Sequence, residues 1–260
     1  METVYFISDA HIGSQNLQNE IIKEQYLIDF FNYLQSQNSI SLYIVGDLFD
    51  FWFEYRCAIP NYYQKILSKM FTLREKGIPI TLVTGNHDFW MRNFFPQQMG
   101  IPVFHGIHTT EIYGKRFLIF HGDGVIKRDV GYRLMKRLLQ HPFFIKLYQL
   151  LHPDIGIPIA RYASHLSRDH YQQDTEKQRQ DDQEYFDFAV KQFAEGYDFV
   201  VMAHSHRPVR ITDNSHVYIN LGDWFSNFTY GIFDGKKLLL EKWKLKPITE
   251  EKKLISPATS

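Results

Sequence analysis

The sequence predicts an α/β fold with partly parallel sheets, because short strand-like runs alternate with helical segments. Six apolar or β-branched runs are typical of buried strands. They are Val4–Ser8, Leu42–Gly46, Ile80–Thr84, Phe117–His121, Phe199–Ala203 and Val217–Leu221. Between the first two runs, apolar residues recur with helical spacing from Ile21 to Leu34, and a second helix is expected from Tyr62 to Lys76. Alternation of this kind favours parallel pairing of the strands.

The rest of the chain divides into three predicted parts. The succession of strand-like runs ends after Gly124, and a helical pattern interrupted by prolines continues to about Glu195. A hairpin from Tyr230 to Trp243, with its turn at Asp234-Gly235, closes the strand-rich part. We therefore expect a core of residues 1–124 and 196–246, an inserted helical lid of residues 125–195, and a flexible tail of residues 247–260.

Composition excludes several classes of protein. Lys plus Arg and Asp plus Glu both total 29, so a balanced charge gives no indication of nucleic-acid binding. Cys57 is the only cysteine, which excludes a disulfide framework and favours a reducing compartment. No run reaches the roughly 18 apolar residues that span a bilayer. The expectation is a cytoplasmic protein, either soluble or peripheral to a membrane.

Five polar clusters follow five of the predicted strands. They are Asp9-x-His11, Gly46-Asp47, Gly85-Asn86-His87-Asp88, His121-Gly122-Asp123 and His204-Ser205-His206. Loops at the carboxyl ends of parallel strands gather at one edge of a sheet, so we expect these clusters to converge. Carboxylate, imidazole and amide oxygen donors without thiols suit Mn, Fe(II) or Zn. The sequence thus predicts a metal centre for one of these ions or for a mixed pair of them, and Mn²⁺ is the expected cofactor.

These clusters, together with Gly46-Asp47-x-x-Asp50, resemble the signature of the calcineurin-like metallophosphoesterases. The resemblance implies a sandwich of two sheets flanked by helices, and a hydrolase that cleaves phosphate esters or anhydrides. It also implies the metal ligands: Asp9, His11 and His206 for one ion, Asn86, His121 and His204 for the other, and Asp47 between them. His87 would contact the transferred phosphoryl group or protonate the leaving oxygen, and Asp88 would orient a histidine. One departure is Ala203, where the family usually has Gly before the last His-x-His pair.

A finer resemblance covers most of the chain. The run Gly46–Trp52, the HGD motif followed by Asp129 and Tyr132, the helical insertion, and Leu221–Trp224 resemble the UDP-2,3-diacylglucosamine hydrolases. That family implies a water attack on the α-phosphorus of an acylated UDP-sugar, which gives UMP and an acylated sugar 1-phosphate. It also implies substrate contacts from the lid. Asp129, Tyr132 and Ser167 are the matching positions, and Arg161, Arg168 or Lys177 are the substituting ones. The best-known members carry Arg where this chain has His87.

The lid is basic and apolar in its first half. Leu138 and Phe144 belong to an apolar set that runs from Leu134 to Leu151, and six Lys and Arg residues accompany it. Such a segment suits acyl chains or an anionic membrane surface, here the cytoplasmic face of an inner membrane. The alternative is that these residues only pack the lid against the core.

Two other functions stay open. A calcineurin-like phosphodiesterase or phosphatase with a small soluble substrate is favoured by His87 and opposed by the long apolar lid. A non-catalytic membrane-associated scaffold would have lost metal ligands, whereas all seven positions here hold residues that can bind a metal.

Overall fold

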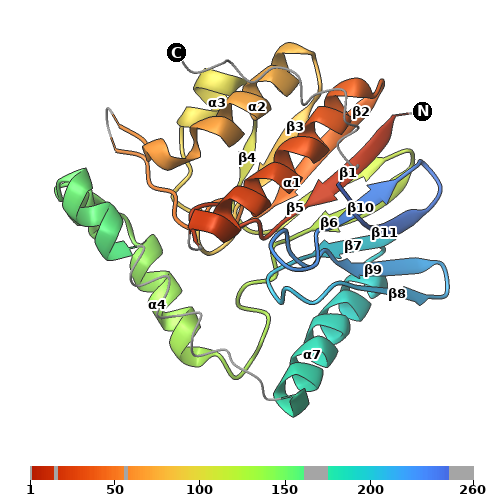
Figure 1. Cartoon of the computed structure of the whole chain (residues 1–260). Coiled ribbons are helices and arrows are strands. Elements are labelled where there is room, and N and C mark those ends of the chain that lie inside the picture. The colour runs from red at the N-terminus through yellow and green to blue at the C-terminus, as the bar shows by residue number, and fades with distance from the viewer. Residues whose placement is uncertain (1, 15–16, 56–57, 161–174, 246–260) are drawn as a thin grey trace.

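The computed structural model describes residues 2–14, 17–55, 58–160 and 175–245. In this part of the chain two sheets pack face to face, and helices cover their outer faces (Figure 1). The predicted sandwich of two sheets flanked by helices is therefore confirmed. The tail of residues 247–260 lies outside the described residues.

The first sheet has the strand order β11-β10-β1-β2-β3-β4. Its strands are β1 (Thr3–Ile7), β2 (Ile40–Val45), β3 (Ile80–Val83), β4 (Val103–Phe104), β10 (Thr229–Phe233) and β11 (Leu238–Lys242). The strands from β1 to β4 are parallel, as predicted, and β10 pairs antiparallel with both β1 and β11. The turn between β10 and β11 is at Asp234-Gly235, where Gly235 has a φ of 92° and Asp234 accepts two backbone hydrogen bonds.

The second sheet has the order β5-β6-β7-β9-β8. Its strands are β5 (His108–Ile112), β6 (Lys115–Ile119), β7 (Phe199–Met202), β8 (Val209–Asp213) and β9 (His216–Asn220). The central strands β6, β7 and β9 are parallel, and the two edge strands pair antiparallel with them. The helices are α1 (Leu17–Ser36), α2 (Gln64–Glu75), α3 (Phe94–Met99), α4 (Val130–Gln140), α5 (Pro142–Tyr148) and α7 (Thr175–Ala194), with a 3₁₀ turn η1 (Asn61–Tyr63) before α2.

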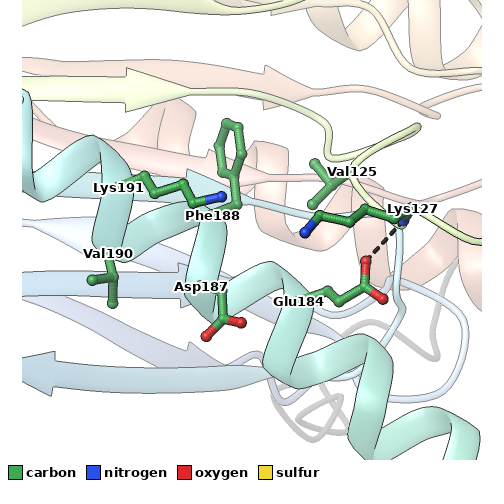
Figure 2. A pocket seen from close by; sticks show the side chains of 7 residues that line it. All are labelled: Val125, Lys127, Glu184, Asp187, Phe188, Val190 and Lys191. Atoms are coloured by element: carbon green, nitrogen blue, oxygen red, sulfur yellow. Dashed lines mark hydrogen bonds between the residues drawn. The ribbon is translucent and has the colours of Figure 1, made fainter.

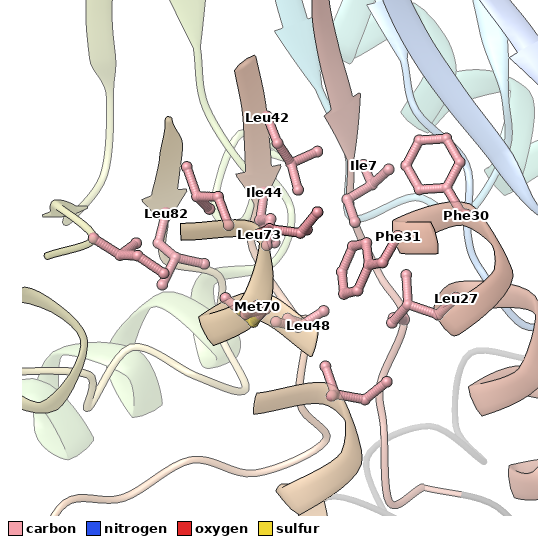
Figure 3. Packing of buried hydrophobic residues seen from close by; sticks show 14 of the residues in the cluster. Ile7, Leu27, Phe30, Phe31, Leu42, Ile44, Leu48, Met70, Leu73 and Leu82 are labelled. Atoms are coloured by element: carbon pink, nitrogen blue, oxygen red, sulfur yellow. The ribbon is translucent and has the colours of Figure 1, made fainter. Parts of the chain in front are cut away.

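Alternation of side chains along the strands builds the layers. In β1, Tyr5 and Ile7 pack under helices such as α1, while Phe6 points to the other sheet and stacks with Phe117 of β6 at 6.0 Å between ring centroids. Figure 3 shows the helix-side cluster, in which Ile7 and Phe31 lie between the strands and α1. Because adjacent residues face opposite layers, each strand can serve two cores at once.

Helix α7 packs on the outer face of the second sheet. Tyr185, Ala189 and Phe193 are buried there, at intervals of four residues that place them on one side of the helix. They meet Leu118 of β6 and Val200 of β7. The second half of the predicted lid segment therefore contributes to a hydrophobic core, and the predicted lid boundaries of 125–195 stay a prediction.

Helices α4 and α5 form an arm that stands away from both sheets (Figure 1). No residue of α4 is buried, and α5 buries only Ile145. The arm is fixed to the core by an aromatic cluster in which Trp90 stacks with Tyr148 of α5 at 5.7 Å between ring centroids. Trp90 also donates a 3.2 Å hydrogen bond to the backbone oxygen of Leu139. Among the described helices, none combines the length and the apolar character needed to cross a bilayer.

The different packing of α7 and of the arm can be tested by matched substitutions. Phe193→Ala in α7 removes a side chain that is 7% exposed, so we expect it to lower the free energy of unfolding by about 3–5 kcal/mol. Phe143→Ala in α5 removes one that is 62% exposed and should change it by less than about 0.5 kcal/mol. Urea unfolding followed by circular dichroism measures both. If both variants changed the free energy of unfolding by the same small amount, α7 would not be part of the core.

Candidate metal centre

The predicted ligands lie at the carboxyl ends of strands from both sheets. Asp9, Asp47, His121 and His204 are each the second residue after a strand, namely β1, β2, β6 and β7. Asn86 is the third residue after β3. The expectation that these ends converge is met, because side chains from loops 195 residues apart, those of His11 and His206, approach within 3.2 Å.

The side chains gather in two groups. In the first, Asp9 Oδ1 lies 3.1 Å from His206 Nε2 and 3.6 Å from His11 Nε2. In the second, His121 Nε2 lies 3.2 Å from both His204 Nδ1 and Asn86 Oδ1. The donor atoms of Asp9, His11 and His206, and likewise those of Asp47, His121 and His204, all lie within 4.8 Å of one another.

Asp47 lies between the two groups. Its Oδ2 atom is 3.1 Å from His121 Nε2 and 3.8 Å from His11 Nε2. Its other oxygen, Oδ1, accepts a 2.8 Å hydrogen bond from the backbone N–H of His87. One oxygen is thus held by the protein while the other faces both groups.

The residues present fit a pair of divalent cations. Asp9, His11, Asp47 and His121 are at most 2% exposed, so their polar atoms have little access to water. Ring nitrogens of different histidines face each other at 3.2 Å in both groups, which is how lone pairs converge on a shared cation. Buried carboxylates are otherwise costly unless they are paired or bind a metal.

Two glycines make room for these side chains. A Cβ atom at Gly85 would lie 2.1 Å from Asp47 Oδ1, and one at Gly46 would lie 2.4 Å from His121 Nδ1. Both distances are far below contact distance. The side chains of Asp47 and His121 fit there only because Gly85 and Gly46 have no side chain.

Charge within the cluster shifts the pKa values of its members. Burial raises the pKa of Asp47, but the imidazoles of His121 and His87 outweigh it and lower that pKa well below its usual range. Burial lowers the pKa of His11 to about 4, despite the nearby Asp9 carboxylate. Burial and the neighbouring His121 likewise lower the pKa of His204 to about 4. At neutral pH Asp47 is therefore a carboxylate, and His11 and His204 are neutral imidazoles, the forms that bind metal ions. Burial lowers the pKa values of His121 and His206, but the carboxylates of Asp47 and Asp9 outweigh it and raise both, so metal binding at these two imidazoles releases protons.

Comparison with known proteins decides the family. Residues 2–208 match the family model described as calcineurin-like phosphoesterase. The chain belongs to the calcineurin-like phosphoesterases. It is thus a metal-dependent hydrolase, and the groups described above are its candidate metal-binding groups.

Two curated relatives with the same name match this phosphoesterase over most of their length. A UDP-2,3-diacylglucosamine hydrolase of Porphyromonas gingivalis is 32% identical over 92% of this chain and 96% of its own. A protein of the same name from Haemophilus ducreyi is 28% identical over 86% and 92%, respectively. Among solved structures, a novel archaeal phosphodiesterase covers 92% of this chain and 98% of its own at 15% identity, with a TM-score of 0.47.

The backbone of the phosphoesterase site is unusual. Five of the seven predicted ligands have positive φ angles: Asp9 at 49°, His11 at 43°, Asp47 at 53°, His204 at 69° and His206 at 56°. Such conformations cost residues other than glycine roughly 1–3 kcal/mol each. Ala203 is not among the residues with positive φ, so alanine is accommodated where the family usually has glycine.

Two residues of the GNHD motif have distinct surroundings. His87 is 13% exposed, and its Nδ1 lies 2.9 Å from the backbone oxygen of Asp50. Asp88 accepts hydrogen bonds from the backbone N–H groups of Gly85 at 2.8 Å and Leu48 at 3.0 Å. The expectation that Asp88 orients a histidine is wrong, because its oxygens instead join the loops that carry Asn86 and Asp47. Burial and the charge of Asp47 raise the pKa of Asp88 to about 7.

The predicted substrate contacts are spread over the arm. Tyr132 is near the cluster: its hydroxyl donates to Asp123 Oδ2 at 3.1 Å, and its ring lies 6.2 Å from that of His204. Asp129 directly precedes α4. Leu138 and Phe144 are 49% and 38% exposed. The remaining predicted contacts, Arg161, Ser167 and Arg168, lie outside the described residues.

Two lysines near the site were not predicted. Lys136 of α4 forms an ion pair with the buried Asp123 and so joins the arm to the loop of His121. Lys23 of α1 is 1% exposed and donates to the backbone oxygen of His11 at 2.5 Å and to Ser14 Oγ at 3.0 Å. It also pairs with Glu20, whose carboxylate accepts from the Gly13 N–H at 2.7 Å.

A separate groove lies between the start of the arm and α7. Figure 2 shows its lining residues, with Lys127 beside Glu184 of α7 and a 2.8 Å hydrogen bond from the Lys127 backbone N–H to the Glu184 carboxylate. The groove encloses about 390 Å³. None of its lining residues belongs to the metal groups, so we assign the chemistry to the strand ends.

The buried Lys23 can be tested as the residue that fixes the His11 loop. Lys23→Met removes the charged donor to the His11 carbonyl, so we expect the affinity of the Asp9, His11 and His206 group for Mn²⁺, used as the probe ion, to fall about 10- to 100-fold. Titration calorimetry on the chelator-treated protein measures both sites.

Matched variants separate this effect from general destabilisation. Lys65→Met removes a lysine that is 69% exposed and pairs with Glu24 at the surface, and it should leave both Mn²⁺ affinities unchanged. Adding Glu20→Gln to Lys23→Met should restore stability, because it removes the unpaired carboxylate, but not the lost affinity. Wild-type affinity at both sites in Lys23→Met would contradict the assignment.

Proposed function

We propose that this phosphoesterase cleaves the diphosphate of UDP-2,3-diacylglucosamine. Water attacks the α-phosphorus, and the products are UMP and 2,3-diacylglucosamine 1-phosphate (lipid X). The shared name of relatives that match over most of their length supports this substrate. So does the arm of α4 and α5 beside the metal centre.

The observation that carries the proposal is the exposed apolar surface of this arm. Leu134, Leu138, Phe143 and Leu147 are between 49% and 69% exposed, although the arm is joined to the His121 loop through Asp123. Packing against the core would have buried them, so the packing alternative does not account for their positions. Acyl chains that cover them would contribute roughly 0.8 kcal/mol per buried methylene.

We propose that two divalent ions occupy the two donor groups. One would be held by Asp9, His11 and His206, the other by Asn86, His121 and His204, and Asp47 Oδ2 would be shared. When bound, the ions supply Lewis acidity and offset the charge of the phosphoryl oxygens. The many imidazole donors disfavour Mg²⁺, which prefers oxygen ligands, and we propose Mn²⁺.

We assign the contact with the phosphoryl group to His87. Its Nδ1–H donates to the Asp50 carbonyl, which fixes the orientation of the ring. As a neutral group Nε2 accepts a proton, and as an imidazolium it donates one to a phosphoryl or leaving oxygen. Asn86 precedes His87 in the chain. Asp47 lies beside His87 because its Oδ1 accepts a hydrogen bond from the His87 backbone N–H.

We assign the acylated sugar to the arm. Leu138 and Phe144 would contact acyl chains, and Asp129 and Tyr132 would line the passage from the arm to the metals; Arg161, Ser167 and Arg168 remain predicted substrate contacts. Because a diacylated substrate resides in a membrane, we propose a cytoplasmic enzyme that acts at the inner-membrane surface. The basic side chains of the arm contribute less than predicted, since Arg133, Lys136 and Arg128 are engaged by protein groups.

His87 favours one second candidate, a phosphodiesterase or phosphatase with a small soluble ester. The curated relatives and the apolar arm support the acylated nucleotide instead. The two functions differ in which substrate has the higher kcat/KM.

An isotope experiment tests the proposed reaction. The chelator-treated protein should be inactive, Mn²⁺ should restore activity better than Mg²⁺, and UDP-2,3-diacylglucosamine in H₂¹⁸O should yield ¹⁸O-labelled UMP. Label in the sugar phosphate would place the attack on the other phosphorus. A higher kcat/KM for bis(p-nitrophenyl) phosphate than for the acylated nucleotide would favour the second candidate, and full activity after chelation would reject metal dependence.

A further inference from the structure

A short loop after β9 is fastened to the first metal group. Asp223, which is 2% exposed, accepts through Oδ1 from the backbone N–H groups of Phe225, Ser226 and Asn227 at 2.6–3.0 Å. Asn227 Nδ2 donates to Asp223 Oδ2 at 2.7 Å and to the His206 backbone oxygen at 3.0 Å. The Trp224 N–H donates to the backbone oxygen of Asp9 at 3.1 Å. The loop is therefore fixed relative to two predicted ligands.

This loop places the ring of Phe225 beside the metal groups. The ring centroid lies 5.2 Å from that of His206 and 6.1 Å from that of His11, with interplanar angles of 84° and 61°. Phe225 is half-buried and belongs to none of the four hydrophobic clusters of the described chain. Its aromatic ring lies next to a charged site without packing into a core.

Phe225 and the arm flank different halves of the metal centre. Tyr132 and Lys136 of α4 bind Asp123, and the Tyr132 ring is near His204 of the second group. Among the aromatic rings of the described residues, that of Phe225 pairs with those of His11 and His206, both in the first group. In the proposed substrate the α-phosphorus carries the nucleoside on one oxygen and the acylated sugar phosphate on another. If the acylated sugar phosphate follows the arm, the nucleoside extends along Phe225.

We propose that Phe225 forms the stacking wall of a nucleobase subsite. This inference rests on the proposed function and names the residue that binds the nucleoside half of the substrate. Aromatic side chains stack on any base, because every base presents a π-face. Rigid attachment of the loop through Asp223 keeps the ring in place before the substrate arrives. The subsite should therefore select for a planar base and discriminate weakly between uracil and cytosine.

The test compares two substrates in three proteins loaded with Mn²⁺. The substrates are UDP-2,3-diacylglucosamine and the same acylated sugar diphosphate with a methyl group in place of uridine. In wild type the uridine substrate should have the higher kcat/KM. In Phe225→Leu, which keeps an apolar side chain, the ratio of the two values should fall about 5- to 150-fold. Phe225→Trp should keep the ratio or raise it.

A control and a binding measurement complete the design. Phe71→Leu changes a phenylalanine of α2 that is 45% exposed, and both the substrate ratio and the metal content should stay at wild-type values. UMP binding, measured by calorimetry, should weaken by a similar factor in Phe225→Leu and remain unchanged in Phe71→Leu. This binding measurement needs no turnover, so it tests the subsite even if the acylated nucleotide proves not to be the substrate.

The outcomes separate the two proposals. Equal losses on both substrates in Phe225→Leu would show that the ring only supports the histidines, and would overturn the subsite. An unchanged ratio with unchanged UMP affinity would overturn it as well. If wild type hydrolyses neither acylated compound, the proposed function fails, and weaker UMP binding by Phe225→Leu alone would then support the subsite.

Discussion

The structure depends on negative charge that is buried where the two sheets meet. Asp9 and Asp47 are at most 1% exposed, and their low pKa values mean that both are carboxylates at neutral pH. Two buried carboxylates without partners would be expensive. Four imidazoles and an amide oxygen surround them. Most of these metal-binding atoms face the centre of one of the two metal groups and not a backbone partner. The arrangement is stable when cations occupy those centres, so metal binding and folding are coupled.

The same constraint explains the loops around the site. Five ligands adopt left-handed backbone conformations, which cost energy unless neighbouring contacts enforce them. The enforcing contacts are polar and buried: Lys23 holds the His11 carbonyl, Asp88 joins two ligand loops, and Asp223 holds the loop beside His206. Each acts through backbone groups, so it fixes the position of a ligand without occupying the site.

Sequence patterns predicted what depends on local periodicity. The six predicted strands overlap observed strands, because their residues are buried and form continuous apolar runs. The edge strands β5 and β8 were missed, since no residue of either is fully buried and their sequences carry no such run. Lys23 was missed because a lysine in an amphipathic helix is normally exposed, and only the tertiary fold reveals its burial. The stripe of Tyr185, Ala189 and Phe193 could have indicated that α7 covers a sheet.

The most direct test of the buried-charge account is the change in melting temperature on chelation, in wild type and in Asp9→Asn/Asp47→Asn. Wild type should lose several degrees when its ions are removed, because ions present at 100 times their Kd stabilise a protein by about 2.7 kcal/mol. In the double variant the buried charges are gone, so chelation should change the melting temperature by less than about one degree. A wild-type melting temperature that chelation leaves unchanged would contradict the account.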